Sequence, residues 1–132
     1  MKKIAILFFV LMCAGLQTFA AECTVQFSSD RYLNKVKDII LKSTSCEEGA
    51  HIAEACALGA SGDLQTVPVA IEKCEIDFMT KLSTSDKVAY HNLQSKCFEK
   101  YETLNGSMYK SMAIFCSLQV SRLYSELYTP AD

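Results

Sequence analysis

The sequence predicts an all-α fold, a small bundle of about five helices that is stapled by three disulfides and follows a cleaved signal peptide. Three observations favour it. Apolar residues recur at helical spacing along most of the chain, alternating strand patterns are nearly absent, and six cysteines follow the apparent export signal. The length of 132 residues suits one domain. The formal charge of −2 gives no electrostatic reason to expect nucleic acid as a partner.

The first twenty residues have the pattern of a signal peptide. Two lysines precede an apolar run over residues 4–16, which is shorter than the roughly 20 residues that a membrane helix needs. Thr18 and Ala20 place small residues where a signal peptidase cleaves, after Ala20. We therefore expect a signal peptide over 1–20 and a single helical domain over 21–132. The formal charge of that domain is −4, because the two lysines leave with the signal.

The cysteines indicate the compartment of the mature protein. An even count in a small exported domain predicts disulfides, because free thiols do not persist in an oxidising compartment. No C-x-x-C pair occurs, so a zinc ribbon, a thioredoxin-type dithiol and a haem attachment site lose support. We expect a periplasmic or secreted protein. The cysteines expected to form its three disulfides are Cys23, Cys46, Cys56, Cys74, Cys97 and Cys116.

The first two helices are expected before residue 60. Ser28 or Ser29 is a suitable cap for a helix that runs to about Lys42, where a run of serine and threonine interrupts it. A second helix is expected to begin near Glu47, since an acidic residue suits the positive end of a helix. The segment from Gly59 to Gly62 is expected to end this helix.

The third and fourth helices have recognisable starts. Thr66 is expected to cap the third, with Pro68 tolerated in its first turn, and the apolar repeat continues to Phe78. Ser83 and Asp86 have the spacing of a capping box, which predicts the start of the fourth helix.

The last two helices are expected to form a hairpin. Asn105 and Gly106 end the fourth helix, Ser107 is expected to cap the fifth, and Pro130 bars its extension. The residues expected to form the inner stripes are Tyr90, Leu93, Cys97, Tyr101 and Leu104 in the fourth helix and Met108, Met112, Phe115, Cys116, Leu123 and Leu127 in the fifth.

The same hairpin predicts one disulfide. Cys97 lies nine residues before Gly106 and Cys116 ten after it, so antiparallel helices bring the two cysteines level. Cys46–Cys56 is disfavoured, since ten residues of continuous helix span about 15 Å. For the other four cysteines two pairings stay open, Cys23–Cys56 with Cys46–Cys74, which we prefer, or Cys56–Cys74 with Cys23–Cys46.

No catalytic or metal-binding pattern stands out. Glu48 and His51 form an E-x-x-H motif on one helical face. A dimetal site in a helical bundle needs two such motifs, and the second is missing because Val88 stands where a glutamate would precede His91. Nucleophile elbows and phosphate-binding loops are absent from the sequence, and bridged cysteines are not nucleophiles. We therefore expect neither catalysis nor a cofactor.

One charge pattern suggests a function. Residues 46–79 carry a net charge of −6, whereas residues 81–128 carry +2. An acidic helical hairpin attracts a basic partner through its long-range field. We expect a non-catalytic binding protein, an inhibitor or immunity protein against a basic cell-wall hydrolase. The candidate partner-binding residues are Glu47, Glu48, Glu54, Asp63, Glu72 and Glu75.

The expected partner is a basic envelope protein, neither nucleic acid nor, after signal cleavage, a membrane, and we expect a monomer or a small homo-oligomer. In size, export and cysteine use the protein resembles small periplasmic helical inhibitors and immunity proteins, including all-helical lysozyme inhibitors. No signature motif accompanies the resemblance, so no residue roles are carried over.

Two alternatives remain. Met108, Tyr109 and Met112 suit a carrier of a small apolar ligand. Insect odorant-binding proteins are similar in being exported, helical and six-cysteine, but their second and third cysteines are four positions apart, whereas Cys46 and Cys56 are ten apart. A small envelope enzyme without a recognisable motif is the last alternative.

Overall fold

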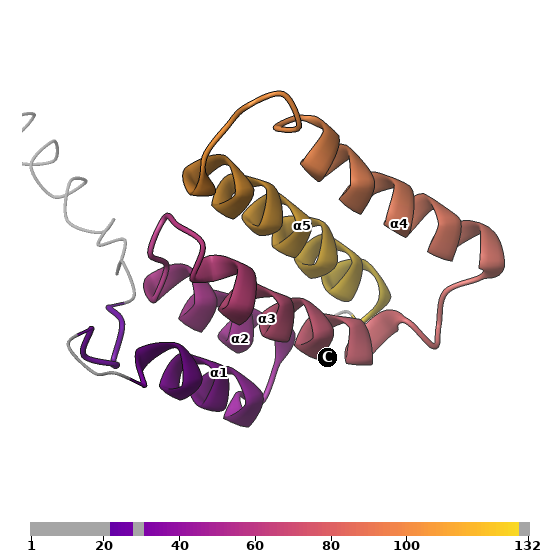
Figure 1. The fold of residues 1–132 in the computed structure, drawn as a ribbon. Helices are drawn as coiled ribbons and strands as arrows, with labels where there is room; N and C mark the ends of the chain where they lie inside the picture. Colours follow the sequence, from indigo (N-terminus) through magenta and orange to yellow (C-terminus); the bar gives the residue numbers. More distant parts are fainter. Residues whose placement is uncertain (1–21, 28–30, 130–132) are drawn as a thin grey trace, which may run out of the picture.

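Five α-helices follow one another in the computed structural model, which describes residues 22–27 and 31–129 (Figure 1). The described part is 71% helical and contains no strand, so the predicted all-α class is confirmed. The expected signal peptide, Ser28, Ser29 and Pro130 lie outside the described residues, but the N-cap of the first helix is Arg31, so the predicted serine cap is wrong. The helices are α1 (Tyr32–Lys42), α2 (Cys46–Ala55), α3 (Asp63–Phe78), α4 (Thr84–Glu99) and α5 (Ser107–Tyr128).

The bundle is built around α3 and α5. α3 packs against α1, α2 and α5, and the pair α3–α5 makes the most extensive contact. α4 lies on the outside, and α5 is the only helix of the described residues against which its backbone packs closely (Figure 1). None of the described helices is both long and apolar enough to cross a membrane.

Two helices, α2 and α4, begin with a serine N-cap. Ser45 accepts a hydrogen bond from the Glu48 backbone N–H at 3.1 Å and so caps α2. Ser83 accepts one from the Asp86 N–H at the same distance, which confirms the predicted cap of α4. Each cap supplies a partner for a backbone N–H that has none inside its helix.

The predicted cap of α3 is wrong. α3 begins at Asp63, three residues before Thr66, which is buried inside the helix. The Asp63 carboxylate accepts hydrogen bonds from the backbone N–H groups of Leu58, at 2.8 Å, and Ala60, at 3.2 Å. Asp63 therefore fixes the loop between α2 and α3 through these two bonds. Because α3 begins earlier than predicted, Pro68 lies in its second turn rather than its first.

The start of α5 also differs by one residue from the prediction. Gly106, with φ of 126°, is the N-cap, and Ser107 is the first helical residue. A positive φ is a conformation that glycine adopts without steric cost. The turn between α4 and α5 therefore depends on Gly106 rather than on a serine cap.

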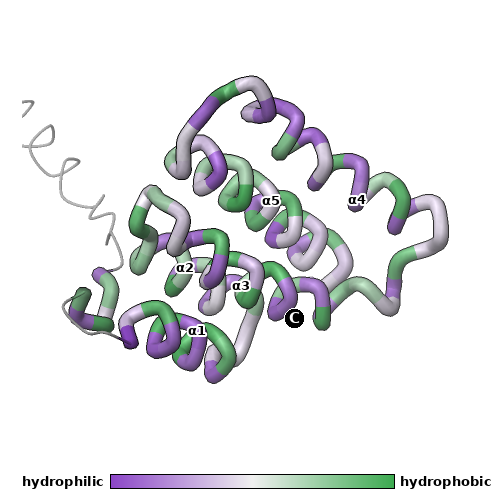
Figure 2. The backbone as a smooth tube through the Cα atoms, viewed as in Figure 1, coloured by the Kyte–Doolittle hydropathy of each residue, from purple (hydrophilic) through white to green (hydrophobic). Residues whose placement is uncertain are grey.

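All five helices contribute to one apolar core, and hydrophobic and hydrophilic positions alternate along each of them (Figure 2). Phe78 of α3 and Tyr90 of α4 meet edge to face, with ring centroids 5.1 Å apart. The largest fully buried apolar side chains are Tyr90, Phe78, Ile40, Leu118, Val36 and Val67.

The buried face of α5 is not the predicted one. Met108, Met112, Leu123 and Leu127 are exposed, as are Leu93 of α4 and Leu104 of the following turn. The opposite face is buried instead, because its serines find polar partners on α3 and α4 while small side chains let the helices approach closely. The buried residues of α5 are Ser111, Ala113, Ile114, Ser117, Leu118, Ser121 and Ser125.

Three disulfides tie the helices together. Cys97–Cys116 joins α4 to α5 with a Cα–Cα distance of 5.5 Å, as the hairpin predicts. The preferred of the two open pairings is confirmed: Cys23–Cys56 fastens the N-terminal segment to the end of α2, and Cys46–Cys74 joins α2 to α3. All six cysteines of the described residues are bridged, which indicates an oxidising compartment, extracellular or periplasmic.

Candidate functional site

A groove of about 660 Å³ lies between α1, α2 and the segment before α1. We call it the acidic groove. Apolar atoms of Ile39, Ile52, Ala55 and the Cys23–Cys56 disulfide line it, and all of these residues are half-buried or buried. The charged or titratable residues of its lining are all exposed, and they are Glu22, Lys42, Glu47, Glu48 and His51.

The cap of α2 positions Glu48 at the groove. While Ser45 caps the helix, the Glu48 carboxylate accepts hydrogen bonds from the backbone N–H of Thr44 at 2.6 Å and from its hydroxyl at 2.8 Å. These two bonds, aided by the positive charge of Lys73, lower the pKa of Glu48. Glu48 therefore remains a carboxylate under more acidic conditions than an unpaired glutamate.

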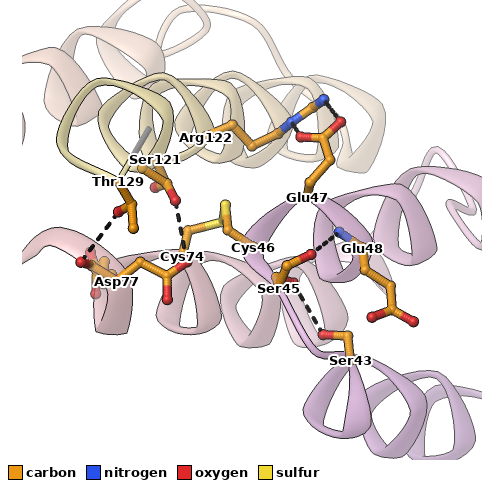
Figure 3. The surroundings of a disulfide bond; sticks show 12 residues. Ser43, Ser45, Cys46, Glu47, Glu48, Cys74, Asp77, Ser121, Arg122 and Thr129 are labelled. Carbon is orange, nitrogen blue, oxygen red and sulfur yellow. Dashed lines mark hydrogen bonds and ion pairs between the residues drawn. A yellow bond between two sulfur atoms is a disulfide. The ribbon is translucent and has the colours of Figure 1, made fainter. Parts of the chain in front are cut away.

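Glu47 and Glu54 lie on the side of α2 that faces α5. The Arg122 guanidinium donates two hydrogen bonds to Glu47, at 2.6 and 3.1 Å (Figure 3). It donates one more to Glu54, at 3.0 Å. His51 lies between the same carboxylates, with Nε2 at 2.8 Å from Glu47 and Nδ1 at 3.6 Å from Glu54. Both glutamates are thus held by residues of the protein itself.

The remaining predicted acidic residues do not join this surface. Asp63 is buried, and besides its two backbone partners it accepts a hydrogen bond from Ser111 of α5 at 2.6 Å. Glu75 is half-buried and accepts one from the Tyr90 hydroxyl at 2.8 Å. Glu72 is exposed on α3. The acidic hairpin is therefore not one continuous patch, and only Glu47 and Glu48 of the predicted residues line the groove.

Sequence reasoning missed the polar centre around Tyr90. Its hydroxyl contacts Ser121 at 2.7 Å and accepts a hydrogen bond from Gln94 at 2.6 Å, in addition to donating to Glu75. Burial raises the pKa of Tyr90 well above its usual range. This network joins α3, α4 and α5 around a fully buried tyrosine, so we assign it to the fold.

The E-x-x-H motif does not form in space as its spacing suggests. His51 contacts Glu47 and Glu54, and its partner in the motif, Glu48, is instead held by Thr44. Over the described residues, no group of three or more histidine, cysteine, aspartate or glutamate side chains is arranged to hold a metal ion.

A second pocket, of about 580 Å³, lies where α4 ends and α5 begins. We call it the aromatic pocket. Tyr101 and Tyr109 are stacked there with ring centroids 6.5 Å apart. The predicted Met108 and Met112 do not line it, although Tyr109 does. The concentration of aromatic residues on both sides of the Gly106 turn is the sequence signal that indicates it. Its lining residues are Leu64, Phe98, Glu99, Tyr101, Glu102, Leu104, Tyr109, Lys110 and Ala113.

Comparison with protein-family models, with curated proteins and with solved structures finds no match to this protein. The assignment of a site therefore rests on the residues themselves. The acidic groove combines an apolar lining with exposed carboxylates, and this is the chemistry that a long basic side chain requires.

Proposed function

We propose that this protein is an exported, non-catalytic binding protein whose acidic groove receives a basic side chain of a partner protein. The observation that carries the proposal is the composition of the groove. The methylene stem of a lysine or arginine packs against apolar atoms while its charged head remains with carboxylates. In the groove, Ile39, Ile52 and Ala55 supply the apolar atoms for the stem. Glu22 and Glu48 supply the carboxylates for the charged head.

Glu22 and Glu48 are the carboxylates best suited to a partner. Neither forms an ion pair with any residue that the structure describes, whereas Glu47 is already paired with Arg122 and His51. The lowered pKa of Glu48 keeps it charged. The net charge of −4 on residues 21–132 favours approach of a basic molecule from a distance.

We identify the partner class as a basic cell-wall hydrolase, which this protein inhibits in the periplasm or outside the cell. Such enzymes share the compartment that the disulfides indicate, and many carry a basic surface toward an anionic cell wall. The export signal that the sequence predicts supports the same location.

The test is a pull-down of binding proteins from the envelope extract of the producing organism, with the oxidised mature protein as bait. The double variant Glu22→Gln, Glu48→Gln removes the two carboxylates that form no ion pair among the described residues. Its matched control, Asp38→Asn with Glu72→Gln, removes the same charge from exposed residues of α1 and α3 that line neither the acidic groove nor the aromatic pocket. Circular dichroism checks that both variants are folded.

We expect mass spectrometry to identify a basic hydrolase that the wild type and the control retain and the groove variant loses. Retention should weaken as salt is added, because exposed charges are screened. Equal retention by both variants, or retained proteins that are not basic, would reject the groove as the binding site.

The aromatic pocket favours a second candidate, a carrier of a small apolar ligand. Its volume of about 580 Å³ lies in the range of small-molecule sites. Displacement of the neutral dye N-phenyl-1-naphthylamine measures such binding. The variant Phe98→Ala should weaken dye binding and Leu41→Ala, an exposed residue of α1, should not. Dye binding that is unchanged in Phe98→Ala would exclude the pocket.

A further inference from the structure

The turn between α4 and α5 exposes an Asn-Gly pair. Asn105, Gly106 and Ser107 are all exposed, and Gly106 adopts φ of 126°. Among the backbone hydrogen bonds of the described loops and caps, none is donated by Gly106. The backbone nitrogen that follows the Asn105 side chain is therefore accessible and unengaged, and the residue that carries it has no side chain to shield it.

We propose that Asn105 is a site of spontaneous deamidation. The deprotonated backbone nitrogen of Gly106 attacks Cγ of the Asn105 amide, and the new C–N bond closes a succinimide ring. The bond between Cγ and the amide nitrogen of Asn105 breaks, and that nitrogen leaves as ammonia with protons from solvent. Water then adds to one of the two imide carbonyls and opens the ring to aspartate or isoaspartate. One water is consumed and one ammonia released for each residue, and no oxidant or reductant takes part.

The protein supplies its own comparison, since it contains two other asparagines. Asn34 lies in α1 and Asn92 in α4, and both are exposed. The backbone N–H after Asn34, that of Lys35, donates to the Arg31 carbonyl at 3.0 Å. The residue after Asn92 is Leu93, inside α4, where the helix likewise engages the backbone nitrogen. Exposure is thus shared by all three asparagines, and only Asn105 has a free nucleophile beside it.

The fold tolerates the product. The new carboxylate lies directly before the N-cap of α5, where the positive end of a helix favours a negative charge. Isoaspartate lengthens the backbone of the connection by one methylene group. The Cys97–Cys116 disulfide holds α4 and α5 together independently of that connection. The modification therefore changes the charge beside the aromatic pocket and leaves the helices in place.

The test is incubation of the oxidised wild-type protein at neutral and at mildly alkaline pH, followed by peptide mass spectrometry. We expect the peptide that contains Asn105 to gain the mass difference between an amide and an acid and to split into two products, faster at the higher pH because the nucleophile is the deprotonated nitrogen. The peptides of Asn34 and Asn92 should keep their amides.

Two variants separate the chemistry from a change in fold. Asn105→Gln should abolish the mass gain, and Asn105→Asp should keep the helical spectrum and the three disulfides, as a mimic of one product. An Asn105 amide that persists as long as those of Asn34 and Asn92 would overturn the proposal. Loss of all three amides at one rate would also overturn it, since exposure alone would then control the reaction.

Discussion

Arg122 of α5 forms a bidentate ion pair with Glu47 of α2, in which Nη2 lies 2.6 Å from Oε1 and Nε lies 3.1 Å from Oε2. The same guanidinium reaches Glu54 at 3.0 Å, and the arginine side chain is only 17% exposed. A planar guanidinium in this geometry binds two carboxylates with little freedom. The acidic face of α2 is thus, in large part, a means of attaching α2 to α5.

Replacement of Arg122 by glutamine should therefore destabilise the protein. The change leaves Glu47 and Glu54 close together with only His51 and the Gln119 amide as partners among the described residues, and we expect a loss of about 1–2 kcal/mol. Urea unfolding followed by circular dichroism measures it. Lys110→Gln removes the same charge from an exposed lysine that forms no ion pair among the described residues, and it should leave the midpoint unchanged. Equal midpoints for the two variants would contradict this role of Arg122.

The disulfides should differ in what they stabilise. Cys97–Cys116 fastens α4, whose backbone packs closely against α5 and against no other described helix, whereas Cys46–Cys74 lies between α2 and α3 at the centre of the bundle. Serine replacement of the first pair should lower the free energy of unfolding by roughly 3 kcal/mol in the chain-entropy model. The backbone amides that lose protection from hydrogen exchange should lie mainly in α4. Replacement of the second pair should lower protection throughout. A uniform loss from both variants would mean that α4 is not a separate unit.

The sequence predicts the helices and the Cys97–Cys116 disulfide because those depend on local chemistry, whereas it leaves two pairings open for the other four cysteines. Ser83 caps α4 through a neighbour three residues away, and Cys97 and Cys116 are level because a hairpin turns at Gly106. These are short-range relationships that spacing alone determines. The start of α3 is an intermediate case, since Asp63 is recognisable as a helix-starting residue only when its bonds to the preceding loop are known.

The inner face of α5 could not be predicted in the same way. Helical spacing favours the stripe of Met112 and Leu123, but both are exposed. Ser111 and Ser121 are buried instead, because Asp63 and Tyr90, distant in sequence, supply their hydrogen bonds. A buried hydroxyl costs free energy unless it has a partner, and the partner is visible only in three dimensions.

The candidate site shows the same limit. Charge counting treats the acidic residues of α2 and α3 as one surface. The structure instead directs Asp63 and Glu75 inward, to Ser111 and Tyr90. Glu48 lines the groove as the sequence allows, but the groove itself depends on the Cys23–Cys56 disulfide, which brings the N-terminal segment beside α2.

Asp63 should be the most sensitive acidic residue of the fold. Its carboxylate is buried and serves three donors, the backbone N–H groups of Leu58 and Ala60 and the hydroxyl of Ser111. Alanine at this position leaves one buried and two half-buried donors without this partner, so we expect a loss of about 2–4 kcal/mol. Thermal unfolding measures it against Asp38→Ala, an exposed aspartate of α1, which should change little. A small effect at Asp63 would mean that water replaces the carboxylate.

The pH dependence of stability should reveal Glu48. Its pKa is lowered in the folded protein by the two hydrogen bonds from Thr44 and by Lys73, so folding favours the ionised form. A lowered pKa contributes stability that is present above the unfolded pKa of glutamate and is lost as the pH falls through the folded value. Glu48→Gln should therefore lower the melting temperature at neutral pH, and its difference from the wild type should shrink in acid.

The control for this measurement is Glu72→Gln, an exposed glutamate of α3 for which no hydrogen bond or ion pair is found among the described residues. Its melting curve should follow that of the wild type over the whole range. A Glu48→Gln difference that stays constant from neutral to acid pH would show that the amide disturbs the cap of α2 sterically. Convergence of the two curves in acid would identify the ionised carboxylate as the group that Thr44 stabilises, which is the charge state that the acidic groove requires.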